Sequence, residues 1–63
     1  MSNRIELYCK HSEEDRIEFE IDSSGEMFIM IKNTIGDESL ITSVILNNED
    51  VLNLKKFINN NLL

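Results

Sequence analysis

The chain has 63 residues, 41% of them hydrophobic, and twelve acidic residues against six basic ones give a formal net charge of −6. This length predicts a single domain, residues 1–63, and the lone Cys9 excludes an internal disulfide. Because we find neither an export signal nor a run of apolar residues long enough to span a membrane, we expect a reducing, cytoplasmic setting and no membrane contact.

The negative charge is concentrated in residues 1–46, which hold the whole −6, whereas residues 47–63 are balanced. An acidic field repels nucleic-acid phosphate and attracts basic protein surfaces. The charge pattern therefore argues against nucleic-acid binding and favours a basic protein partner.

Alternating polar and apolar residues predict the first two strands. In the segment 4–10, Ile5, Leu7 and Cys9 fall on one face, and in the segment 16–22 Ile17, Phe19 and Ile21 alternate with acids. Residues 11–15 form a short polar connection between the two strands. We expect Cys9 to pack in the core beside Leu7.

The sequence Asp22-Ser23-Ser24-Gly25 predicts a type I turn followed by a left-handed glycine, a common three-residue hairpin loop. This turn places Ile17, Phe19 and Ile21 opposite Ile31, Ile29 and Met27 on one core face. A two-residue turn at Ser24-Gly25 would shift the register by one and expose those three partners instead. We favour the first register because it leaves fewer apolar side chains outside.

The rest of the chain predicts a loop, a strand and a helix. Residues 33–38 read as a loop around Gly36, and residues 39–46 as a fourth, mostly apolar strand. Asn47 and the acids after it suit a helix start. One apolar stripe at helical spacing should then be core, with a frayed end at residues 59–61: Val51, Leu54, Phe57, Ile58 and Leu62. We therefore expect an α+β fold, a four-stranded antiparallel sheet followed by one C-terminal helix packed on one face (ββββα).

No residue pattern predicts catalysis, a metal or a cofactor. Cys9, His11 and the acids at 13–15 are metal-capable, but one Cys and one His do not make the paired ligands of a zinc site. Cys9 and His11 could form a nucleophile pair, yet nothing suggests a third orienting group. Gly25 and Gly36 are isolated turn residues, not a phosphate-binding loop. We expect a protein that is not an enzyme.

The outer face of the predicted hairpin is the candidate site for partner binding. Its residues are three acids and two apolar side chains: Glu18, Glu20, Asp22, Phe28 and Met30. The acids can be an ordinary solvated face that protects a sheet edge. They can also be a negative stripe that imitates a nucleic-acid backbone or meets a basic protein groove. The apolar pair, extended by Tyr8 and by Ile41 and Ile45, would be covered by a second copy, covered by another protein, or simply tolerated in water.

The segments IEFEIDSSGEMFIMIKN and NNEDVLNLKKFINN resemble, in style, small acidic proteins of phages and mobile elements. Some of these proteins inhibit host defence, including the anti-CRISPR type, and the resemblance implies a bacterial or phage-infected host cell. The element order is also similar to coactivator-like folds that bind single-stranded nucleic acid. This sequence lacks the basic, aromatic-rich strand surface that such binding uses.

These observations predict a non-enzymatic, acidic interaction module, a phage-type inhibitor that binds a basic protein surface such as a nucleic-acid-binding one. The alternatives are a small homodimeric structural or regulatory protein and a single-strand nucleic-acid-binding, coactivator-like domain.

Overall fold

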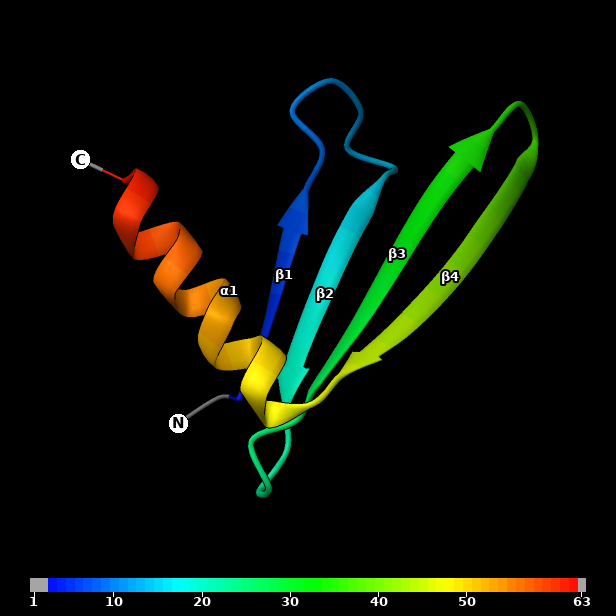
Figure 1. The fold of residues 1–63 in the computed structure, drawn as a ribbon. Helices are drawn as coiled ribbons and strands as arrows, with labels where there is room; N and C mark the ends of the chain where they lie inside the picture. Colours follow the sequence, from blue (N-terminus) through cyan, green and yellow to red (C-terminus); the bar gives the residue numbers. More distant parts are fainter. Residues whose placement is uncertain (1–2, 63) are drawn as a thin grey trace.

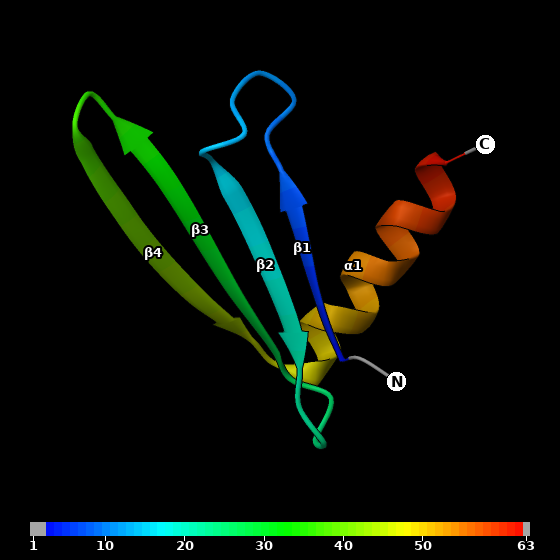
Figure 2. The ribbon, with the colours of Figure 1, turned by 180° about the vertical axis from the view of Figure 1, so that it is seen from behind.

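The computed structural model describes residues 3–62 and has the predicted α+β arrangement. Four strands form one antiparallel sheet in the order β1-β2-β3-β4, and one helix follows them (Figures 1 and 2). The elements are β1 Arg4–Tyr8, β2 Arg16–Ile21, β3 Met27–Ile35, β4 Glu38–Leu46 and α1 Asn48–Asn61.

The hairpin of β2 and β3 has the predicted register. Phe19 lies opposite Ile29, with the Ile17–Ile31 and Ile21–Met27 pairs on either side of it. Gly25 has a φ of +88°, so it supplies the left-handed residue that the turn requires. The Asp22 backbone N–H donates to the Glu26 carbonyl at 3.0 Å and closes the loop.

The predicted loop at residues 33–38 is wrong, because β3 and β4 continue as strands to a tighter turn. Ile35 pairs with Glu38, which leaves only Gly36 and Asp37 between the strands. Gly36 has a φ of +62° and Asp37 does not have a positive φ, the pattern of a type II′ hairpin turn. The longer strands extend the sheet beyond Arg16, the first residue of β2.

The link between β1 and β2 is held by backbone bonds and by one carboxylate. β1 ends at Tyr8, two residues earlier than predicted, and the Cys9 N–H donates to the Asp15 carbonyl at 2.9 Å. The Asp15 side chain accepts from the Thr34 N–H at 2.7 Å, just before β2 begins at Arg16 and where β3 would otherwise lack a partner. Cys9 is exposed, so the expectation that it packs in the core is wrong.

Helix α1 begins as the sequence predicts. The Asn47 side chain accepts from the Asp50 N–H at 2.8 Å, and Glu49 and Asp50 lie in the first turn. The predicted fraying at residues 59–61 is absent, since the helix is regular through Asn61, whose side-chain amide donates to the Phe57 carbonyl at 2.8 Å.

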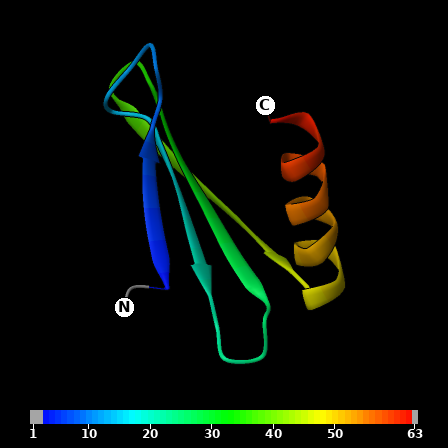
Figure 3. The ribbon, with the colours of Figure 1, turned by 90° about the vertical axis from the view of Figure 1, so that its left-hand side faces the viewer.

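The helix stands opposite one face of the sheet, but its contacts with the sheet are mainly with β4, the strand from which it continues (Figure 3). Among residues 3–62 no hydrophobic side chain is buried, and Phe57 of the helix is 64% exposed. The prediction that the apolar stripe of the helix is core is therefore wrong. Helical spacing shows which side chains share a face, but it does not show how closely that face approaches the sheet.

Candidate functional site

The sheet has two faces with different chemistry. We call the face that is turned toward the helix the groove face. The face that is turned away from the helix is the outer face. Alternation along each strand puts the predicted site residues Glu18, Glu20, Phe28 and Met30 on the outer face, as expected. The fifth, Asp22, lies in the turn beyond the end of β2.

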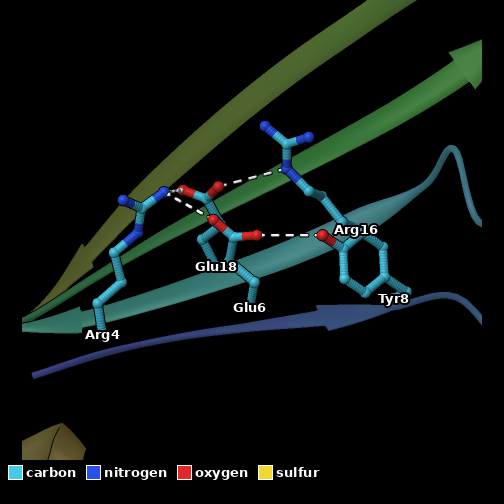
Figure 4. Close-up of polar contacts among 5 residues, drawn as sticks. All are labelled: Arg4, Glu6, Tyr8, Arg16 and Glu18. Atoms are coloured by element: carbon cyan, nitrogen blue, oxygen red, sulfur yellow. Dashed lines mark hydrogen bonds and ion pairs between the residues drawn. The ribbon is translucent and has the colours of Figure 1, made fainter. Parts of the chain in front are cut away.

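The outer face of β1 and β2 carries a network of ion pairs centred on Glu18 (Figure 4). The Glu18 carboxylate lies 2.9 Å from the Arg4 guanidinium and 3.3 Å from Arg16 Nε. Arg4 also reaches Glu6 at 3.0 Å, and the Tyr8 hydroxyl donates to Glu6 at 3.2 Å. The network joins the edge strand β1 to β2 through side chains as well as through the backbone.

Glu18 is the one buried residue among residues 3–62, at 8% exposure. Burial alone would raise the pKa of its carboxyl. The hydrogen bond from Arg4 and the positive charges of Arg4 and Arg16 outweigh burial, so the pKa lies below its ordinary value. Glu18 is thus an anion whose charge is already matched within the chain.

Asp22 is also engaged within the chain. Its carboxylate accepts from the Ser24 N–H at 2.9 Å, from the Ser24 hydroxyl at 2.6 Å and from the Glu26 N–H at 3.1 Å. The Ser24 hydroxyl and these backbone donors hold the pKa of the Asp22 carboxyl below its ordinary value against the effect of partial burial. The row of three acids is therefore not an open negative stripe, and Glu20 alone of the three is exposed without an ion pair or hydrogen bond among residues 3–62.

An apolar cluster lies beside this network, across the outer face of β3 and β4. Phe28 pairs with Ile45, and Ile41 lies opposite Lys32, one step beyond Met30 on the same face. Phe28 is 39% exposed, and Ile41 and Ile45 are about two-thirds exposed, at 64% and 67%. The anticipated extension of Phe28 and Met30 by the two β4 isoleucines is present, but the extension by Tyr8 is wrong, because β2 lies between Tyr8 and β3.

One end of the outer face opens into a polar hollow of about 470 Å³. Its acidic walls come from the β1–β2 link and the β3–β4 turn, and its basic walls are Arg16 and Lys32. The acids are Glu13, Glu14 and Asp37, none of which takes part in the ion pairs found among residues 3–62. Sequence reasoning did not include these acids in the site, because only the pairing of β2 with β3 brings the two loops together.

The groove face forms one wall of an apolar groove of about 730 Å³, and the helix forms the other. The sequence predicted a closed core in this place. The sheet contributes side chains from all four strands, and α1 contributes Leu54 and Ile58. The lining residues of the sheet include Ile5, Ile17, Phe19, Ile21, Met27, Ile29, Ile31, Val44 and Leu46.

The metal-capable residues of the described part of the chain do not gather into a metal site. Within residues 3–62, no three His, Cys, Asp or Glu side chains gather as metal ligands would. Cys9 and His11 are both exposed, and the contact between them is from the His11 backbone N–H to Cys9 Sγ at 3.4 Å. No helix in this part of the chain is both long and apolar enough to cross a bilayer.

Comparison with known proteins identifies no relative. No family model matches the chain, and no curated protein or solved structure is significantly similar to it. A functional assignment for this chain therefore rests on its own residues and geometry.

Proposed function

We propose that this chain is a non-enzymatic interaction module whose outer face binds a basic surface of another protein. The observation that carries the proposal is the exposed cluster of Phe28, Ile41 and Ile45, which lies between acids that form no ion pair among residues 3–62. Glu20 lies beside Phe28, its cross-strand neighbour, and the polar hollow with its three acids lies at the other end of the face.

This arrangement has the composition of a protein interface. Interfaces of this kind have an apolar centre that loses its water on binding and a polar rim that stays partly solvated. The two β4 isoleucines and Phe28 would supply the centre, and Glu20 and the acids of the hollow would supply the rim. The net charge of −6 would steer a basic partner toward this surface and raise the association rate.

A basic protein fits this face better than a nucleic acid does. Arg4 and Arg16 both lie within ion-pair distance of Glu18, so they are poor candidates for phosphate binding. The remaining exposed charges around the cluster are mostly negative and would repel phosphates. In this proposal the chain acts as a phage-type inhibitor that occupies the basic, nucleic-acid-binding surface of its target.

Affinity capture with matched variants tests the proposal. The wild-type chain is immobilised and exposed to an extract of the source cell, and captured proteins are identified by mass spectrometry. Ile45→Ser removes an apolar side chain from the outer face, and Leu52→Ser removes one of similar exposure from the helix, where it lines neither the groove nor the outer face. Glu20→Lys and Glu49→Lys make the same charge change on the outer face and on the helix.

We expect a basic protein that is lost with Ile45→Ser and Glu20→Lys and kept with the two helix variants. With the purified partner, calorimetry should show at least about tenfold weaker binding for Ile45→Ser. For Glu20→Lys it should show weaker binding with a smaller salt dependence. The proposal would be overturned by a partner that binds both outer-face variants as tightly as the wild type. A gel shift with single-stranded DNA at low salt would also overturn it.

A further inference from the structure

The groove between the sheet and α1 is open, and both of its walls are apolar. Ile31 on the sheet wall is 45% exposed, and Ile58 on the helix wall is 43% exposed. Side chains with the sequence pattern of a core thus remain in contact with water. A small domain depends on burying such surface to offset its loss of chain entropy.

The accessible surface of the chain indicates how much area a covering partner would bury. The accessible surface is 5463 Å², whereas a compact monomer of 7.3 kDa exposes about 4,200 Å² by the usual scaling with mass. The excess, about 1,300 Å² per chain, equals about 2,600 Å² for a pair of chains, the range of permanent homodimers.

The charge on the groove lining also favours a second copy of the chain as the partner that covers it. Two copies that each carry −6 repel one another over most of their surface. No acidic residue lines the groove, and its one charged lining residue is Arg4, which already pairs with Glu6 and Glu18. The groove is therefore where two copies can meet without bringing acids together.

We propose that a second copy of this chain covers the groove and that the two copies complete one shared core. A two-fold interface uses the same patch on both partners, so each copy offers its groove face and the Leu54–Ile58 side of α1 to the other. The outer faces point away from this interface. The inference therefore stands apart from the proposed partner binding and does not depend on it.

Sedimentation of the full chain tests the proposal directly. The experiment runs from about 1 to about 100 µM with a thiol reductant, because exposed Cys9 could otherwise cross-link copies. We expect a mass of twice 7.3 kDa and a midpoint of thermal unfolding that rises with protein concentration. A folded monomer over the whole range, with a midpoint that does not depend on concentration, would overturn the inference without the use of any variant.

Two lysine variants of the helix then locate the interface. Ile58→Lys places a charge in the groove, and Leu52→Lys places the same charge on the side of α1 that does not line it. We expect Ile58→Lys to weaken dimerisation at least about a hundredfold and Leu52→Lys to leave it within about twofold. A dimer that Leu52→Lys or the outer-face variant Ile45→Ser breaks, with circular dichroism unchanged, would place the interface elsewhere.

Discussion

Two neighbouring residues of β4 provide a sharp test of which sheet face is covered in solution. Val44 lies on the groove face and Ile45 on the outer face, and they are 50% and 67% exposed. Replacing each with Ala gives the same final residue on the same strand, so the change in strand propensity largely cancels. What differs between the two variants is the burial of the methyl and methylene groups that are lost.

The expected losses of stability can be worked out from these exposures. Each fully buried methyl or methylene group contributes about 0.8 kcal/mol. Val44→Ala removes two groups that the chain itself half covers, and Ile45→Ala removes three groups that it covers by about a third. In an isolated chain both variants would therefore lose about 0.8 kcal/mol. If a second copy covers the groove, the loss for Val44→Ala doubles to about 1.6 kcal/mol, and a cavity term adds to it.

Guanidinium unfolding of the two variants and the wild type, at one protein concentration, measures the difference. We expect Val44→Ala to be at least twice as destabilising as Ile45→Ala. Equal losses would refute the reasoning, because they would mean that the groove face is no better covered than the outer face. A larger loss for Ile45→Ala would mean that the outer face holds the shared core.

Three further predictions concern ionisation, turns and the helix start. The pKa values of Glu18 and Asp22 are lower in the folded chain than their ordinary values of 4.5 and 3.8. Both ionised carboxylates therefore stabilise the folded state fully at a pH above the ordinary values, and this stabilisation is lost as the pH falls through the lower pKa values of the folded chain. Glu18→Gln should flatten the decline in melting temperature on acidification, and an unchanged slope would contradict the assignment. Ala at Gly25 should cost about 1–2 kcal/mol in urea unfolding through its positive φ, whereas a cost near zero would mean that the turn differs. Asn47→Ala should cost about 1 kcal/mol and Asn47→Asp almost nothing, and equal losses would show that the cap contributes little.

Local signals in the sequence were sufficient for the elements and for one register. Alternation in β2 and β3, together with the Asp22–Gly25 turn, placed Phe19 opposite Ile29, because a slip of one residue would have exchanged the two faces. Asn47 marked the helix start for the same kind of reason, since the cap is a contact over three residues. The tight turn at Gly36 escaped prediction because Gly followed by Asp suits a longer loop equally well.

The tertiary structure decided what those elements do together. The candidate acids illustrate this, because only the order of the strands brings Arg4 to Glu18 across β1 and β2, and this pairing turns an expected surface charge into a buried, neutralised one. The position of the helix is the second case. Its apolar spacing is that of a core helix, but spacing along a helix does not encode the distance to a sheet. By itself, the sequence determined which side chains share a face, since strand and helix periodicity are local properties. Whether each face meets the same chain, a second copy or another protein depends on long-range packing, and in this fold the groove between the sheet and the helix stays open.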